Sequence, residues 1–327
     1  MTNSKAGMRP NRRQFVVAAS AMGLLSTSGL SALAAAPANR VTWKGAALGA
    51  EAIIELYHPD PQWAQGQLVK CQNEINRLEN LFSLYRVDSS ISRLNEDGIL
   101  KNPDIDFVQL LSRAKSLSEI SGGAFDVTVQ PMWKLYAEHF KDASADPRGP
   151  TDDKISNTLD LIGSQHIQVD LNQIAFSKAG MGVTFNGIAQ GFITDKITQI
   201  LRDAGFDNVL VSLGEQYALG TKPNAQKWRV GIASSADGQT IEKIVELQDA
   251  AIATSGGYGS PFSPNSSLNH LIDPRTGTTA KLNESVSVIA QSAATADAFS
   301  TALSLMSRDE GEKLIAVDPT VTEVIYT

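Results

Sequence analysis

Asp297 and Thr301 have the residue types and spacing of two metal ligands. They lie four residues apart in the apolar stretch 294–303, so on a helix their carboxylate and hydroxyl share one face. Hard oxygen donors of this kind can hold Mg²⁺ in part, with ligand phosphates and water completing the octahedron. Taken alone, the pair is more typical of a helix-surface aspartate beside an unremarkable threonine.

A glycine-containing segment, residues 181–196, is a second candidate. It begins as a short β-branched and aromatic run, breaks at Asn186-Gly187 and continues with apolar residues at helical spacing. This pattern predicts a strand-to-helix elbow. Gly187 and Gly191 are four residues apart, so another backbone or a bulky ligand can come close, and the helix start is a site for anions. Tight packing within the protein is the competing interpretation.

Two more stretches contain polar side chains in an unusual order. Residues 253–258 read Ala-Thr-Ser-Gly-Gly-Tyr, and residues 270–277 read His-Leu-Ile-Asp-Pro-Arg-Thr-Gly. His270 is one of four histidines, and a single histidine before an apolar pair is usually structural. The single cysteine, Cys71, cannot form an internal disulfide and has helical spacing to apolar neighbours, which predicts a core residue and not a nucleophile.

The elements that must position these residues are of both types. Residues 41–57 are strand-like, and the turn at 59–61 opens an amphipathic helix that runs to about residue 85. Residues 85–95 are polar and turn-rich, a second helix runs from about 104 to 120 and stops at Ser121-Gly122-Gly123, and residues 141–153 predict a mobile surface segment. Further strands are predicted at 167–169, 173–176, 208–213, 228–232, 251–254, 285–289 and 323–326, with helices at the elbow and from about 295 to 306. The pattern predicts an α+β fold with a largely antiparallel sheet in one compact unit.

Residues 1–34 form a predicted twin-arginine signal peptide that is removed, leaving a domain of residues 35–327 in the periplasm. Arg12-Arg13 with Phe15 precedes an Ala/Leu/Val-rich stretch and a small-x-small cleavage site at residues 32–34. The alternative is a Sec signal that contains two arginines. The leader contains four basic residues and no acidic residue, so its removal changes the net charge from −7 to −11 (−7 − 4). An acidic chain is a poor binder of nucleic acid. The chain contains no uninterrupted run of about 18 apolar residues, the length that would span a membrane.

In this order, and over nearly the whole mature chain, these stretches resemble the ApbE family of FAD:protein FMN transferases. The residues that carry the resemblance are Tyr85-Arg86, Asp88-Ser89, 91–95, 122–126, Thr128, Pro131, 186–191, 254–256, 270–277, Ala296-Asp297 and Thr301. The resemblance implies an ApbE-like fold related to the T-fold, with FAD and Mg²⁺ as cofactors.

The chain departs from the family pattern at two places. Family members commonly carry Lys at the position of Gln190, and Gly-Gly-Asp or Gly-Gly-Asn where this chain has Gly214-Glu215-Gln216. Together with the leader, these residues resemble the NosX-type branch associated with nitrous-oxide respiration. Loss of the Lys removes a cation near the pyrophosphate, and a neutral hydrogen bond from Gln is about half as strong as a charged one. The departures bear on the transfer rate more than on FAD binding.

The resemblance implies a reaction in which a Thr or Ser hydroxyl of a partner flavoprotein attacks the FMN-side phosphorus of FAD, and AMP leaves. Such a transfer depends on positioning and on neutralising charge, and Mg²⁺ at the pyrophosphate supplies the second. Asp297 and Thr301 would hold the metal. The Ala189 carbonyl is the third implied ligand, and it can serve only if the elbow is irregular there.

The resemblance also implies roles around the flavin. His270 is the expected base because neutral imidazole is abundant near pH 7, and Asp273 is the second choice, or else orients His270 or holds the metal. Tyr85 would stack on the isoalloxazine ring. The rest of the implied FAD-binding set is Asp126, Gly187, Gln190, Gly214, Glu215, His270 and a turn of Thr254, Ser255 and Gly256.

The implied partner is a periplasmic or membrane-anchored acceptor flavoprotein, for which the nitrous-oxide respiration system is one source. Two other classes stay open. The chain could be a periplasmic FAD carrier without transferase activity, which Gln190 makes credible, or an exported solute-binding receptor. FAD retained after purification would count against the receptor, and partner-dependent release of AMP would count against the carrier.

Overall fold

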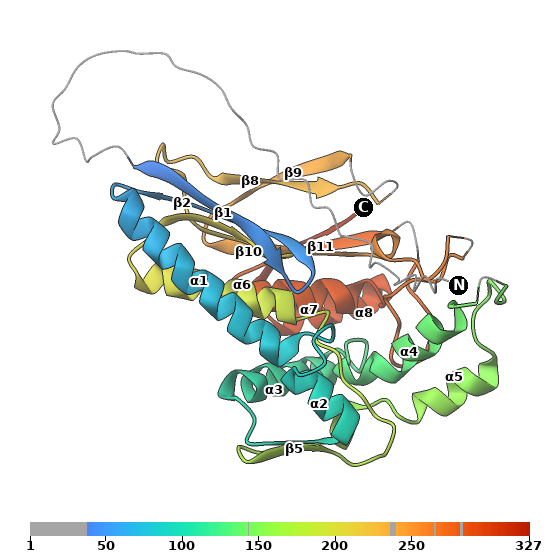
Figure 1. Cartoon of the computed structure of the whole chain (residues 1–327). Helices are drawn as coiled ribbons and strands as arrows, with labels where there is room; N and C mark the ends of the chain where they lie inside the picture. Colours follow the sequence, from blue (N-terminus) through green and yellow to red (C-terminus); the bar gives the residue numbers. More distant parts are fainter. Residues whose placement is uncertain (1–37, 143, 236–239, 265, 282–283) are drawn as a thin grey trace, which may run out of the picture.

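A seven-stranded sheet forms the centre of the protein in a computed structural model that describes residues 38–142, 144–235, 240–264, 266–281 and 284–327 (Figure 1). In spatial order its strands are β1 (Asn39–Ala47), β2 (Ala50–His58), β6 (Asn208–Ser212), β7 (Gln216–Gly220), β10 (Ala250–Gly256), β11 (Ser285–Ala290) and β12 (Val321–Tyr326). Every neighbouring pair is antiparallel. The predicted α+β fold with an antiparallel sheet in one compact unit is therefore confirmed.

Both faces of the central sheet are covered. Helices α1 (Pro61–Phe82), α6 (Ala189–Asp203) and α7 (Ala293–Leu303) pack on one face around the main hydrophobic core (Figure 1). The hairpin of β8 (Trp228–Ala233) and β9 (Ile241–Leu247) covers the other face, where Trp228 and Val230 join Ile252 and Ile289 of the sheet in a second core. All six residues of β11 are buried because the strand is covered from both sides.

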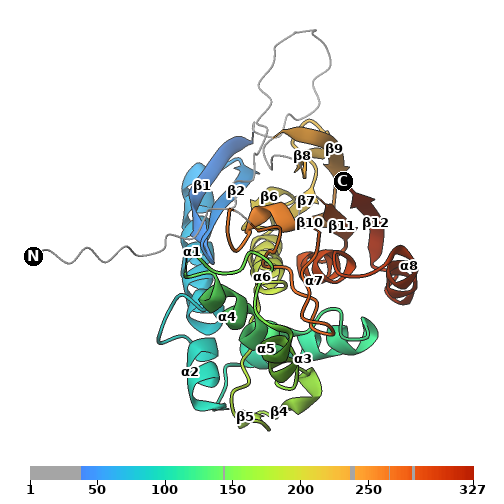
Figure 2. The ribbon, with the colours of Figure 1, turned by 90° about the vertical axis from the view of Figure 1, so that its right-hand side faces the viewer.

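A second group of elements, within residues 90–176, lies beyond the core helices, at the bottom of both Figure 1 and Figure 2. It consists of α2 (Ser90–Asp97), β3 (Ile99–Lys101), α3 (Ile105–Ile120), η1 (Val127–Val129), α4 (Gln130–His139), α5 (Asp152–Leu159), η2 (Ser164–His166), β4 (Ile167–Val169) and β5 (Gln173–Phe176). Its three strands form a small sheet in the order β3-β5-β4. The remaining elements are the 3-10 turn η3 (Gly257–Gly259) and helix α8 (Arg308–Val317), which lies beside α7 and β12. None of the described helices is long and apolar enough to cross a membrane.

The ends of the predicted helices have local causes. The side chain of Asp60 accepts hydrogen bonds from two backbone N–H groups in the first turn of α1, and Pro61 occupies the first position, where a missing N–H costs nothing. Helix α3 ends at Gly122 and Gly123, which have φ values of 60° and 82°, as predicted for this stop. Cys71 is fully buried in α1, as predicted, and burial raises the pKa of its thiol to about 12.

The predicted strand before the elbow is wrong. Residues 181–185 belong to no strand, although most of them are buried. The side chain of Asn95 replaces a neighbouring strand, because its amide donates to the Val183 carbonyl (2.8 Å) and its Oδ1 accepts from the Val183 N–H (2.6 Å). With these backbone groups satisfied, the apolar run stays buried without pairing in a sheet.

The sequence prediction also lacks several elements: α2, α5, α8, β3, β7 and β9. Helices α2 and α5 are eight residues long and largely polar, so they contain too few apolar positions to show a period. Residues 254–256 are not the predicted turn, because they are the end of β10 and pair with β11. Helix α5 begins inside the predicted surface segment 141–153. The predicted leader, residues 1–34, lies outside the described residues.

Candidate active site

Helices α6 and α7 run in opposite directions, and each gives a carboxylate to the start of the other. Asp297 on α7 accepts a hydrogen bond from the Gly191 N–H in the first turn of α6 (3.1 Å). Asp195 on α6 accepts hydrogen bonds from the N–H groups of Ala293 and Ala294 at the start of α7 (2.7 and 3.0 Å). Free N–H groups and the helix dipole favour negative charge at a helix start. The two reciprocal caps therefore hold the helix pair in register.

The two glycines of the elbow allow α7 to approach this closely. A Cβ atom on Gly191 would lie 2.3 Å from the Ala293 carbonyl oxygen, and one on Gly187 would lie 2.9 Å from Thr301 Oγ1. At Gly191 the close neighbour is protein backbone and the anion is the carboxylate of Asp297, so the tight-packing interpretation is correct there. Gly187 instead faces the hydroxyl of one predicted metal ligand.

Asp297 and Thr301 lie together against the start of α6. Asp297 is 4% exposed, so the alternative of a surface aspartate is wrong. Thr301 Oγ1 lies 3.2 Å from the Oγ of Ser255 on β10, and Ser255 also bonds the hydroxyl of Ser300 (2.8 Å). The structure thus brings the predicted residues Gly187, Ser255, Asp297 and Thr301 to one place, where α6, α7 and β10 meet.

The carboxylate of Asp297 and the hydroxyl of Thr301 are oxygen donors of the kind that hard cations bind. One carboxylate, one hydroxyl and one main-chain carbonyl would leave positions for phosphate and water, as Mg²⁺ prefers. The predicted carbonyl belongs to Ala189, the first residue of α6, and Ile188 before it is irregular, with φ −153° and ψ −24°. Across the described residues there is no group of three or more His, Cys, Asp and Glu that could hold a metal ion. The assignment of Ala189, Asp297 and Thr301 stays a prediction.

A pocket between the start of β7, the end of β10 and strand β8 contains three of the predicted FAD contacts, Gly214, Glu215 and Thr254. Its lining residues are Gly214, Glu215, Gln216, Val230, Gly231, Ile232, Ala233, Ile252, Thr254 and Tyr258. Glu215 is buried, and the Thr254 hydroxyl lies 2.7 Å from that of Ser287. The lining of the pocket combines apolar side chains with a carboxylate and a tyrosine ring.

Gln190 connects this pocket to the start of α6. A Cβ atom on Gly214 would lie 2.4 Å from Gln190 Nε2, and Gly214 has a φ of 99°, which favours glycine. Gln190 is itself buried. Its carboxamide therefore packs directly on the backbone of Gly214, and the two places where the sequence departs from the family pattern touch each other.

Tyr85 and Asp126 differ in what they can offer a ligand. Tyr85 is 68% exposed beside the turn between β1 and β2, so its ring is not part of the core. Asp126 is buried, and its carboxylate accepts four hydrogen bonds: from Ser118 Oγ (2.8 Å), Thr128 N–H (2.8 Å), Thr128 Oγ1 (2.6 Å) and Ser164 N–H (2.9 Å). These bonds occupy about four lone-pair positions, which is the capacity of a carboxylate. Bonds within the protein therefore fill the acceptor positions of the Asp126 carboxylate.

The predicted base and its neighbour lie on a loop between η3 and β11. His270 is half-buried, and its backbone N–H donates to the Ser260 carbonyl (3.1 Å). Asp273 is buried and accepts hydrogen bonds from Arg275 Nε (2.9 Å) and Nη2 (2.8 Å). The hydrogen bond to Asp273 raises the pKa of the Arg275 guanidinium, against the opposing effect of burial. The structure thus pairs Asp273 with Arg275.

The sequence prediction gave no role to two residues that shape this region, Asp195 and Arg275. Asp195 lies four residues after Gly191, so its position on the inner face of α6 was readable from the spacing. Burial raises the pKa of Asp195, and the hydrogen bonds from the start of α7 oppose that rise. Arg275 is part of the motif 270–277, but nothing in the motif names its partners.

Residues 48–326 match the model of the ApbE family. The chain belongs to the ApbE family. A curated relative from Vibrio cholerae, an FAD:protein FMN transferase, is 31% identical over 288 residues, which cover 84% of this chain and 84% of the relative. A second FAD:protein FMN transferase, from Haemophilus influenzae, is 29% identical over 240 residues and covers 70% of this chain and 69% of the relative.

Solved ApbE structures share the fold. The apo form of the Pseudomonas stutzeri flavinyl transferase ApbE superposes with a TM-score of 0.71 at 27% identity, covering 85% of this chain and 88% of that one. The flavin transferase ApbE from Vibrio cholerae gives a TM-score of 0.73 at 23% identity and covers 89% and 98% of the two chains. The predicted ApbE-like fold is confirmed.

Proposed function

We propose that this ApbE-family chain transfers FMN from FAD to a Thr or Ser hydroxyl of a partner flavoprotein, with Mg²⁺ and with release of AMP. The class of enzyme is that of its curated relatives, which are FAD:protein FMN transferases. The observation that carries the proposal is the pair of Asp297, which is buried, and Thr301, which is half-buried; both pack on the start of α6 where α6 and α7 meet β10. Strand β10 also lines the adjacent pocket through Thr254.

The chain's own residues would position the reactants. Asp297, Thr301 and the Ala189 carbonyl would hold Mg²⁺, which when bound neutralises pyrophosphate charge. His270 would take the proton from the acceptor hydroxyl as its oxygen bonds to the FMN-side phosphorus, and the bond from that phosphorus to the AMP oxygen breaks. A positioned base of this kind contributes about 10²–10⁴-fold.

The flavin and the pyrophosphate would have separate supports. The exposed ring of Tyr85 would stack on the isoalloxazine, and the residues of the pocket would take the remaining part of FAD. Gln190 would offer a neutral amide where a Lys would offer a charge. The proposed acceptor is a periplasmic or membrane-anchored flavoprotein, and the NosX-like residues favour one of the nitrous-oxide respiration system.

A second candidate function is a periplasmic FAD carrier without transferase activity. Gln190 favours it, because its buried carboxamide packs on Gly214 and brings no cation to the pyrophosphate. Binding of FAD requires only the pocket and the stacking ring, whereas transfer also requires charge neutralisation at phosphorus. The receptor class is set aside because the curated relatives are transferases.

The deciding experiment mixes the protein, FAD, Mg²⁺ and a flavoprotein that carries a Thr acceptor. AMP is measured together with covalent flavin on a denaturing gel. A transferase gives both products and stops with EDTA. Tight FAD binding without either product, across several acceptors, establishes the carrier.

The metal assignment is tested by variants at the same site. Asp297→Ala and Thr301→Val are expected to abolish transfer while FAD still binds, and Thr301→Ser is expected to keep it because the hydroxyl remains. Asp309→Ala, at an exposed aspartate in the first turn of α8, is the matched control. Thermal melting verifies that the variants are folded, since Asp297 also caps α6. Wild-type transfer by Asp297→Ala would refute the proposed metal site.

A further inference from the structure

The loop that carries His270 is held together by its own backbone and by α4. The Asp273 N–H donates to the Thr278 carbonyl (2.7 Å), and the Gly277 N–H donates to the Asp273 carbonyl (2.8 Å). The Tyr136 hydroxyl of α4 donates to the Gly277 carbonyl (2.8 Å). These bonds shape the loop but do not attach it to α7, the helix of Asp297 and Thr301.

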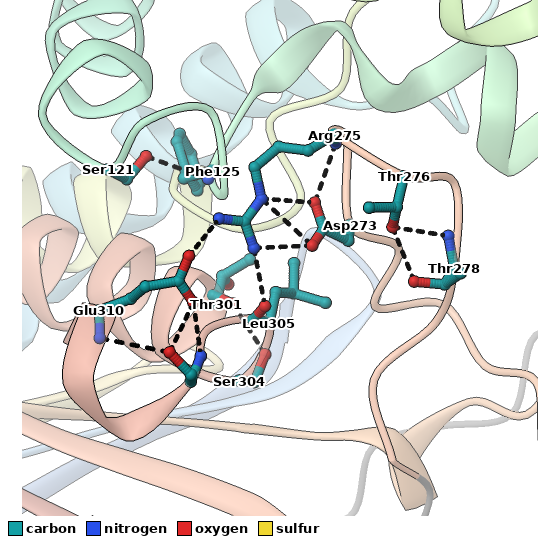
Figure 3. A network of polar contacts seen from close by, with 11 residues as sticks. Ser121, Phe125, Asp273, Arg275, Thr276, Thr278, Thr301, Ser304, Leu305 and Glu310 are labelled. Atoms are coloured by element: carbon teal, nitrogen blue, oxygen red, sulfur yellow. Dashed lines mark hydrogen bonds and ion pairs between the residues drawn. The ribbon is translucent and has the colours of Figure 1, made fainter.

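Arg275 makes that attachment (Figure 3). Its guanidinium binds Asp273 within the loop through Nε (2.9 Å) and Nη2 (2.8 Å). A second N–H of Nη2 donates to the Leu305 carbonyl just beyond the end of α7 (3.0 Å), and Nη1 donates to Glu310 Oε1 in the first turn of α8 (3.1 Å). We call these bonds of Arg275 to Asp273, Leu305 and Glu310 the clamp. Leu305 follows Thr301 by four residues, so the clamp binds the chain about one helical turn from a predicted metal ligand.

The surroundings of Arg275 exclude a role as an anion ligand. Four of its five N–H groups are used, one at Nε, one at Nη1 and two at Nη2. Two carboxylates, Asp273 and Glu310, flank a single positive charge, so the local sum of charges is negative. A pyrophosphate would gain little attraction from this guanidinium. The Arg275 Cγ also lies 3.6 Å from where a Cβ on Gly123 would be, so the stem is packed against the stop of α3.

We propose that Arg275 is a positioning residue for flavin transfer, which fastens the loop of His270 to the corner between α7 and α8. In this way it sets the distance between the base and the metal-holding face of α7. The inference rests on the proposed function for the reaction itself. The planar fork of Arg is required because it bonds a carboxylate bidentately and a carbonyl at once, and the single ammonium of Lys cannot reproduce that geometry.

The test compares steady-state transfer by Arg275→Ala, Arg275→Lys and wild type. Misplacing a reacting group by about 1 Å costs on the order of 100-fold, so kcat for Arg275→Ala is expected to fall by about 10–100-fold. KM for FAD is expected to stay unchanged, because four of the five N–H groups of Arg275 already bond protein atoms and two carboxylates flank its charge. Arg275→Lys is expected to remain low although it keeps the charge, and added guanidinium is expected to restore part of kcat in Arg275→Ala.

Arg148→Ala is the matched control, because Arg148 is an exposed arginine that pairs with the aspartate two residues before it, Asp146, as Arg275 pairs with Asp273. Its kcat is expected to stay close to wild type. A wild-type kcat in Arg275→Ala, or a loss that resides entirely in KM for FAD, overturns the inference. If Arg275→Ala does not fold, Arg275→Lys decides by the same criteria.

Amide hydrogen exchange tests whether Arg275 holds the loop of His270, and this test requires no transfer reaction. The amides of Asp273, Gly277 and Ala280 donate within the loop, and they are expected to exchange faster in Arg275→Ala while those of β11 stay protected. Unchanged loop protection overturns the inference even if the wild type proves to be a carrier. Conversely, the wild type could release no AMP while the loop amides exchange faster in Arg275→Ala. That result overturns the proposed function and supports the clamp.

Discussion

The carboxylate of Asp297 is buried, and a buried charge costs free energy unless hydrogen bonds or other charges compensate for it. Part of the compensation comes from the Gly191 N–H and from the positive end of the α6 dipole. The arrangement requires glycine at 191, because any side chain there would collide with the Ala293 carbonyl. A single missing Cβ therefore allows the predicted metal ligand to reach the helix start.

Gly191→Ala is expected to destabilise the protein by about 1–3 kcal/mol, because the added methyl group forces α6 and α7 apart. Urea unfolding measures the change. Gly66→Ala is the matched control, since Gly66 is also helical, is exposed and has no atom within 4 Å of the added Cβ. That control is expected to gain about 0.5–1 kcal/mol from helix propensity. If Gly191→Ala is as stable as the wild type, the close packing of α6 on α7 is contradicted.

Tyr85→Ala is expected to weaken FAD binding by about 1–2 kcal/mol, the scale of one lost stacking contact with its buried area. Isothermal titration calorimetry measures the affinity. Tyr85→Phe keeps the ring and is expected to bind as the wild type does. Because Tyr85 is exposed, neither variant should change the melting temperature. An unchanged affinity in Tyr85→Ala would mean that the flavin stacks elsewhere.

At the scale of secondary-structure elements, the buried carboxylate of Asp106 connects three helices, α1, α3 and α6. Asp106 in the first turn of α3 forms ion pairs with Lys196 of α6 (2.6 Å) and with Arg77 of α1. Burial by itself would raise the pKa of Asp106, but the hydrogen bonds from Lys196 and Arg77 outweigh burial, and the pKa is lowered. The position of α6, and with it the start that Asp297 caps, therefore depends partly on a charged contact at its outer side.

This contact predicts a component of acid sensitivity. A carboxyl group with a lowered folded pKa contributes stability that is fully present above its unfolded pKa of about 3.9 and is lost as the pH falls through the folded value. The free energy of unfolding of wild type is therefore expected to fall more steeply below about pH 4 than that of Asp106→Asn. Asp153→Asn, at an exposed aspartate of α5, is the control and should keep the wild-type slope. Parallel slopes for Asp106→Asn and wild type would disprove the linkage.

At the scale of the whole molecule, the candidate site lies where the three parts of the fold meet. The core helices contribute Asp297 and Gln190, the hairpin-covered face of the sheet contributes the pocket, and the group of elements within residues 90–176 contributes Gly123 and Phe125. Figure 3 shows Phe125, Thr301 and Arg275 in this shared region although they are far apart in the sequence. A site of this kind is complete only after the whole chain has folded, which agrees with the predicted twin-arginine route, since that route carries folded proteins.

The export prediction is tested with Arg12→Lys and Arg13→Lys combined. We expect the precursor to remain in the cytoplasm with residues 1–34 uncleaved, because the route recognises the paired arginines. Cell fractionation and the mass of the purified chain measure the outcome. A variant with only Lys5→Gln serves as the control for loss of leader charge. Normal export of the double variant would refute the twin-arginine assignment.

The helices of residues 61–82 and 105–120 were predictable because their causes are local. A cap, a proline at the first position, a glycine stop and an apolar period are all read from neighbouring residues. The same holds for the pairing of Asp297 with Thr301 on one helix face, since four residues make one turn. The polar helix α2 escaped prediction because it has too few apolar residues to show a period.

Contacts between distant segments were not accessible in this way. Gly191 packs on Ala293 and Asp297, Asn95 takes the place of a strand beside Val183, and Arg275 bonds Leu305. Each contact depends on which faces pack together, and residue type and periodicity say that a face is apolar without naming its partner. The types of residue at the site could therefore be predicted from the chain, whereas their distances and the clamp at Arg275 depend on the packing of α6, α7 and the loop of His270.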